Sequence, residues 1–148
     1  MIARSVQRVG LGLACALGVA CMADEPTRHR SAPGALGPYS GSVSAGELLF
    51  LSGKIGERGG SFELEARTAL DGVLGELDRA GAGPEDLLSV TVYLTDMGRY
   101  DAFNAIYADV LPAPYPARAC VAVAALPAGA RVEIQGVARR PARRGESP

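Results

Sequence analysis

The 148-residue chain carries 15 Lys and Arg residues against 16 Asp and Glu residues, a formal net charge of −1. This balance excludes the broad basic surface that nucleic-acid-binding proteins use, so no nucleic-acid partner is expected. A single histidine excludes a multi-histidine metal site, and we expect no bound metal. The length fits one domain that can bury its own core.

Residues 1–23 have the layout of a secretory signal peptide. Arg4 and Arg8 precede an uncharged apolar run over residues 9–20, which is too short to span a bilayer comfortably. Small residues follow at Cys21 and Ala23, where a cleavage site would lie. We expect an exported protein, periplasmic or extracellular. The alternative is an uncleaved N-terminus on a cytoplasmic protein.

Residues 17–21 also resemble a bacterial lipobox, with Gly18 where that pattern prefers leucine. In that case Cys21 would carry a lipid anchor, which is the only membrane contact we expect. Cys15 and Cys21 belong to the leader, so Cys120 is the only remaining thiol and no intrachain disulfide is expected. Residues 24–140 then form one domain, and residues 141–148 form a flexible basic tail.

The first half of the domain predicts three strands and a helix. Residues 27–31 favour an edge strand, and an irregular Pro- and Gly-rich loop follows as far as Ser40. Residues 42–44 and 47–52 predict two strands around a turn at Gly46, with Gly53 ending the second. Ser61 is a helix N-cap, and apolar residues then recur at helical spacing until Gly81.

The second half predicts a strand, a helix and two more strands. Residues 88–94 alternate between apolar and polar side chains, and Asp96 caps a helix over about residues 100–111. Residues 115–127 form an apolar run bounded by prolines, which predicts a mostly buried strand. Residues 131–138 alternate again, with Glu133 opposite in direction to Val132 and Ile134. The order is βββαβαββ, an α+β fold with two helices on one face of the sheet.

Such a sheet leaves its second face without cover, and packing against another subunit would cover it. One charged residue, Arg118, begins the apolar strand. A guanidinium cannot lose its proton on burial, so it needs an anionic partner or water. Either a protein carboxylate pairs with Arg118, or Arg118 awaits the carboxylate of a ligand. The residues alone favour the ion pair.

Several short motifs then occur in an order and spacing that are specific together. They are Gly37-Pro38-Tyr39-Ser40, Leu51-Ser52-Gly53-Lys54-Ile55, Thr91-Val92-Tyr93-Leu94-Thr95-Asp96, Phe103-Asn104 with Tyr107, Tyr115-Pro116-Ala117-Arg118-Ala119-Cys120, Ala125-Leu126-Pro127 and Val132-Glu133-Ile134. In these motifs the chain resembles the RidA/YjgF family of reactive-intermediate deaminases, across residues 27–139.

The resemblance implies a chorismate-mutase-like α+β sandwich that assembles as a homotrimer with a cleft between each pair of subunits. It implies hydrolysis of 2-imino acids, such as 2-iminopropanoate and 2-iminobutanoate, to 2-keto acids and ammonia. It also implies that the reaction needs no metal and no organic cofactor. The alternative function is a trimeric module that binds small carboxylates without turnover, and an envelope holdase ranks third.

The resemblance also assigns roles to residues. Arg118 would bind the substrate carboxylate, and Glu133 would hold the attacking water and move its proton. The other substrate-binding positions are Tyr39, Ser52, Gly53 and Cys120, with Cys120 as a contact rather than a nucleophile. From the residues alone, Glu133 would instead pair with Arg118 or Arg131, Tyr39 would be a core aromatic, and Gly53 would mark a bulge or turn.

Two features depart from the family pattern. Lys54 stands where the family usually has glutamine, which adds a positive charge beside the expected site. The connection over residues 56–62 is shorter than usual, so one rim of the cleft differs. Asn104 matches a recurrent family position, although the polarity of a helix surface explains it almost as well.

Overall fold

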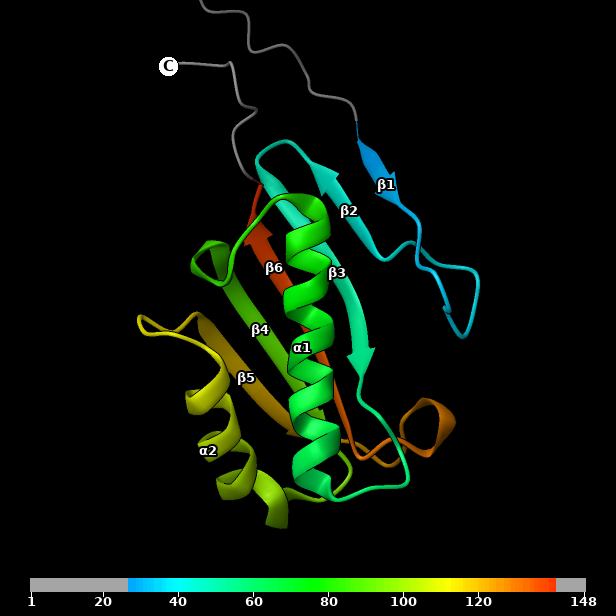
Figure 1. The fold of residues 1–148 in the computed structure, drawn as a ribbon, viewed down its shortest axis with the longest axis vertical. Coiled ribbons are helices and arrows are strands. Elements are labelled where there is room, and N and C mark those ends of the chain that lie inside the picture. The colour runs from blue at the N-terminus through cyan, green and yellow to red at the C-terminus, as the bar shows by residue number, and fades with distance from the viewer. Residues whose placement is uncertain (1–26, 141–148) are drawn as a thin grey trace, which may run out of the picture.

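The computed structural model describes residues 27–140, so the predicted leader and basic tail lie outside the described residues. A six-stranded sheet has the strand order β1-β2-β3-β6-β4-β5 and carries both helices on one face (Figure 1). The strands are β1 (Arg28–Arg30), β2 (Ser42–Ala45), β3 (Leu48–Ile55), β4 (Leu87–Leu94), β5 (Ala117–Ala122) and β6 (Val132–Arg139). The helices are α1 (Phe62–Ala80) and α2 (Tyr100–Val110). The predicted α+β order βββαβαββ is confirmed.

All strand pairs are antiparallel except β4 and β5, which are parallel. Parallel neighbours need a crossover connection, and α2 supplies it. As a result β5 is an edge strand, with α2 above it and only β4 beside it. No helix in residues 27–140 is long and apolar enough to cross a bilayer.

Helix α1 begins and ends where the sequence predicts. The Ser61 hydroxyl accepts a hydrogen bond from the backbone N–H of Leu64 at 3.1 Å. At the other end Gly81 adopts a left-handed conformation with φ of 79° and donates to the carbonyls of Leu77 and Asp78. Such an N-cap contributes about 1 kcal/mol. These two caps fix the length of the helix that covers the centre of the sheet.

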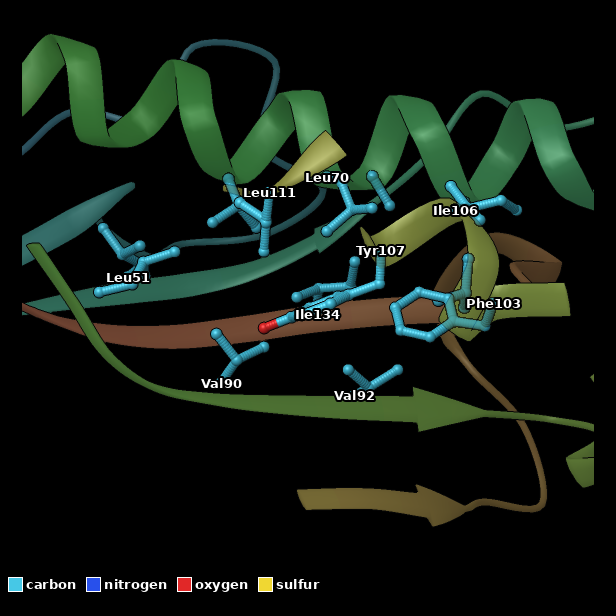
Figure 2. Packing of buried hydrophobic residues seen from close by; sticks show 14 of the residues in the cluster. Leu51, Leu70, Val90, Val92, Phe103, Ile106, Tyr107, Leu111 and Ile134 are labelled. Carbon is cyan, nitrogen blue, oxygen red and sulfur yellow. The ribbon is translucent and has the colours of Figure 1, made fainter. Parts of the chain in front are cut away.

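The core lies between the helices and the sheet. Figure 2 shows side chains from β3, β4 and β6, such as Leu51, Val92 and Ile134, packed against Phe103 and Ile106 of α2. On β6 the predicted alternation is confirmed, because Val132, Ile134, Gly136 and Ala138 are all buried. Glu133 therefore lies on the opposite, open face of the sheet.

Three local predictions are wrong. Strand β3 does not end at Ser52 but continues to Ile55, because a bulge between Leu51 and Lys54 absorbs Gly53 without ending the pairing to β6. Asp96 caps a short 3₁₀ turn, Met97–Arg99, which precedes α2. Finally, the run over residues 115–127 is not mostly buried. In β5 only Arg118 and Cys120 are half-buried and the other residues are exposed, since an edge strand has one neighbour.

The open face of the sheet exposes large apolar side chains. Phe50 is 43% exposed and Val121 is 42% exposed, and Leu48 lies on the same face. The register places Phe50 opposite Val137, and Val121 opposite Tyr93. This face and the β5 edge are where the chain lacks cover from its own elements.

Candidate active site

Glu133 lies in a cavity of about 340 Å3 on the open face of the sheet. Four of the predicted site residues line this cavity together: Tyr39, Ser52, Gly53 and Glu133. The remaining lining residues include Leu36, Pro127 and Gln135. The structure therefore brings together, within one chain, the predicted acid/base carboxylate and most of the predicted substrate-binding positions.

Gly53 makes room for the Glu133 carboxylate. A Cβ atom at position 53 would lie 1.8 Å from Oε1 of Glu133, far inside van der Waals contact. Only glycine lets the carboxylate lie against the backbone at this point. The bulge in β3 and the position of Glu133 are thus one arrangement.

The loop before β2 forms the rim of this cavity. Tyr39 is 48% exposed, so the prediction of a core aromatic is wrong. Its hydroxyl accepts a hydrogen bond from the Leu36 N–H at 3.4 Å. The Ser52 hydroxyl donates to the Ser40 carbonyl at 2.6 Å, which ties the loop to β3. Ser52 therefore holds the rim in place in the unliganded chain.

Glu133 forms no ion pair among residues 27–140, so the predicted pairing with Arg118 or Arg131 is absent there. Arg131 is committed elsewhere. Its Nε lies 2.6 Å from Oε2 of Glu65, and its backbone N–H donates to Oε1 of the same buried carboxylate. The Glu133 carboxylate thus remains available to water or to a ligand.

Arg118 lies in a different environment, beneath α2 on the helix-covered face. Its Nη2 donates a hydrogen bond to Oδ1 of Asn104 at 2.6 Å. The guanidinium also lies 4.7 Å from the centroid of the Tyr107 ring, within cation–π range. A weaker contact of 3.4 Å joins Nη2 to the Tyr100 hydroxyl.

No carboxylate among the described residues pairs with Arg118, so the structural ion pair favoured by the residues alone is not observed there. Arg118 instead lines an open cavity of about 310 Å3 with Asn104, Tyr107 and Tyr115. A guanidinium that is oriented by neutral groups and keeps its full charge is suited to binding an anion.

Cys120 lies two residues after Arg118 on the same side of β5, opposite Val92. Burial raises the pKa of its thiol, and the charge of Arg118 opposes this only in part. The thiol is therefore protonated near neutral pH, which suits a contact residue and not a nucleophile.

The two halves of the predicted site lie on opposite faces of the sheet within one chain. Arg118 is opposite Val90 in the register, and Val90 packs into the core. Glu133 is opposite Tyr93, whose side chain points to the open face. A single protomer therefore presents the guanidinium and the carboxylate in two separate cavities, both at surfaces that its own elements leave open.

Residues 29–140 match the protein family described as Endoribonuclease L-PSP. The chain belongs to the RidA/YjgF family. RutC family protein y4sK of Sinorhizobium fredii is 40% identical over 120 residues, which cover 76% of this chain and 95% of that protein. The 2-iminobutanoate/2-iminopropanoate deaminase of Homo sapiens is 39% identical over 114 residues, 72% of this chain and 83% of that one.

Solved structures agree with the fold of this RidA/YjgF protein. Escherichia coli TdcF with bound serine superposes with a TM-score of 0.69 at 34% identity, covering 79% of this chain and 99% of that one. Yeast Mmf1 superposes with a TM-score of 0.74 at 28% identity, covering 78% of this chain and all of that one.

Sequence reasoning missed the residues that orient Arg118 in this RidA/YjgF protein. Tyr107 was expected only as an apolar residue of the second helix, and Asn104 was nearly explained by surface polarity. The available signal was their spacing, since positions 104 and 107 lie on one face of a helix. That face points at β5, so both side chains contact the guanidinium.

Lys54, the predicted extra charge beside the site, pairs with a carboxylate that the sequence did not indicate. Its Nζ lies 2.9 Å from Oε2 of Glu76, which is fully buried on α1. Burial raises the pKa of Glu76, but hydrogen bonds from Lys54, Arg79 and Ser42 outweigh it and lower the pKa below 4.5. Glu76 is therefore an ionised carboxylate inside the fold.

Proposed function

We propose that the protein is a hydrolytic deaminase of 2-imino acids, with 2-iminopropanoate and 2-iminobutanoate as representative substrates. The observation that carries the proposal is Arg118, a guanidinium held by Asn104 and Tyr107 with no carboxylate partner in the described chain. Relatives at 37–39% identity, named reactive intermediate deaminase and 2-iminobutanoate/2-iminopropanoate deaminase, support the same chemistry.

The two faces of the sheet require two protomers for one site. The β5 edge of one subunit, with Arg118 and Cys120, would pack on the open face of the next, with Glu133, Gly53 and Tyr39. An interface of this head-to-tail kind closes into a ring, and we propose a homotrimer with three such clefts. The exposed apolar side chains of Phe50 and Val121 support contact at these surfaces.

In the assembled cleft Arg118 binds the substrate carboxylate through charge-assisted hydrogen bonds and fixes the imine carbon. Glu133 takes a proton from water as the water oxygen bonds to that carbon, and the C=N bond becomes a C–N single bond. The same carboxyl returns the proton to nitrogen, and the tetrahedral intermediate expels ammonia as the C=O bond forms. The products are a 2-keto acid and ammonia, so the reaction needs no further reactant.

The decisive test couples an amino-acid oxidase, which releases imine, to trapping of the imine by semicarbazide. The wild-type protein should lower the trapped fraction, and Arg118→Ala or Glu133→Gln should reduce this effect by about a hundredfold or more. Arg67→Ala is the matched control, because Arg67 is an exposed guanidinium paired with Asp109. Equal trapping with and without protein contradicts the deaminase. Saturable binding of a 2-keto acid without turnover would instead identify the small-carboxylate-binding module.

The shared cleft has its own test. Arg118→Ala and Glu133→Gln subunits are each inactive, but mixed rings contain clefts that take Arg118 from one variant and Glu133 from the other. Random mixing in equal amounts should restore about a quarter of wild-type activity. Co-refolded mixtures that stay inactive, while forming mixed oligomers by native mass spectrometry, would contradict a site built from two protomers.

We also propose that residues 1–23 direct export and are then removed, with lipidation at Cys21 as the alternative form. The support is the sequence layout, a positive start, an apolar run and small residues before Asp24. The intact mass of protein isolated from the native cell envelope distinguishes a cleaved soluble form, a lipidated form and the uncleaved chain.

A further inference from the structure

A second cavity adjoins the one that holds Glu133. It has a volume of about 330 Å3 and lies between the loop over residues 32–39 and the end of β3. Leu36, Tyr39, Gly53 and Ile55 line both cavities. The two spaces therefore share a wall at the point where Gly53 lies against the Glu133 carboxylate.

Three cations line this second cavity: Lys54, Arg58 and Arg79. No Asp or Glu of the described chain lines it. The buried Glu76 carboxylate pairs with both Lys54 and Arg79, so it offsets one of the three charges. Arg58 donates to the Ala128 carbonyl, which is a neutral partner. The cavity thus keeps a surplus of positive charge.

The backbone adds to this surplus. Strand β2 pairs with β3 only as far as Leu51, whereas β3 continues to Ile55. The outer edge of Gly53–Ile55 therefore lies beside the cavity and not beside another strand. A further cation, Arg30, is opposite Ser42 in β1, and its buried Nη1 has no hydrogen-bond partner. This end of the sheet has more donors and cations than the described carboxylates satisfy.

We propose that this cavity binds the distal carboxylate of an acidic substrate, so that the protein prefers 2-imino acids derived from dicarboxylic amino acids. The inference rests on the proposed function, since it places the reacting carbon beside Glu133. The first carboxylate goes to Arg118 of the adjoining protomer, and the side chain passes Tyr39 and Gly53 to reach Arg58 and Arg79. Opposite charge at the far end then selects acidic over apolar side chains.

The test compares two imines of the same chain length, released by oxidases from L-glutamate and from L-norvaline. Wild-type kcat/KM should be about fivefold higher for the acidic imine, the scale of a partly exposed charge-assisted contact. Arg79→Gln and Arg58→Gln should each lower this ratio severalfold and leave the norvaline imine unaffected. Arg67→Gln is the control, because it removes an arginine from the same helix, α1, but not from the cavity.

A wild-type ratio of one or less overturns the proposal, as does an equal loss for both imines in the Arg79→Gln variant. Inorganic phosphate is the second probe, followed by calorimetry with wild type and with the Arg58→Gln/Arg79→Gln double variant. Phosphate binding that the double variant loses, without a preference for the acidic imine, would assign the cavity to a separate anion and refute the substrate assignment. Activity on neither imine would refute the deaminase itself, and retained phosphate binding by the double variant would refute the cavity as an anion site.

Discussion

Replacing Gly53 with alanine tests whether the placement of Glu133 matters for chemistry. The new Cβ would lie 1.8 Å from Oε1 of Glu133, while real Cβ atoms essentially never approach closer than 3.0 Å. The carboxylate must therefore move by at least 1.2 Å, the difference between these two distances. It belongs to the end of a flexible side chain, so the move is possible without unfolding.

A displacement of this size in a catalytic group costs about a hundredfold in rate. We therefore expect Gly53→Ala to reduce kcat in the coupled imine assay by about that factor, with a melting temperature close to that of wild type. The matched control is Gly75→Ala in α1, where a Cβ would meet no atom within 4 Å. That variant should keep full activity and gain up to about 1 kcal/mol of stability, because alanine favours a helix interior.

Full activity in Gly53→Ala would refute the catalytic role of Glu133, or at least the need for its observed position. Loss of folding in Gly53→Ala would refute the claim that the side chain can yield to the new methyl group. Either result is measured directly, by turnover and by thermal denaturation of the same sample.

The remaining predictions concern three other residues. Asn104→Ala should raise KM severalfold without unfolding the protein, and Asn104→Asp should lower activity further, because a carboxylate would pair with Arg118; unchanged KM in both contradicts the orienting role. Cys120→Ala should keep activity within about twofold, since burial raises the pKa of the thiol; a loss above tenfold would indicate a nucleophile. Glu76→Gln should cost roughly 3 kcal/mol near pH 7. The folded pKa of Glu76 lies below 4.5, so its contribution is complete above that pH and lost on acidification through the folded pKa; denaturant titrations should show a flatter acid limb in the variant.

The local patterns of the sequence predicted the elements well. Alternation in β6 placed Glu133 on the opposite face from Ile134, and Ser61 and Gly81 marked both ends of α1. These features depend on neighbouring residues, so periodicity and capping chemistry are enough to find them. The motifs around Tyr39, Ser52, Gly53 and Glu133 also indicated residues that the fold brings into one cavity.

The ion pairs could not be predicted in the same way. Lys54 and Glu76 are 22 residues apart, and Glu65 and Arg131 are 66 apart. Both carboxylates belong to α1, where a helical pattern alone would expose them. Glu65 looked like a first-turn acid that favours the helix dipole, yet it is buried and holds the start of β6. Which cation meets which carboxylate depends on how α1 lies on the sheet.

The prediction about β5 failed for a different reason, and that reason bears on function. An apolar run shows that a strand is covered, but it does not show whether the cover comes from the same chain. In the single chain β5 has one neighbouring strand and exposes Val121, while Phe50 is exposed on the open face. A sequence that makes an edge strand this apolar, and begins it with an arginine that has no carboxylate partner among residues 27–140, is suited to an edge that another protomer covers. On this argument the apolar run and the available guanidinium have one cause, because the surface that completes the cover also brings the Glu133 half of the site.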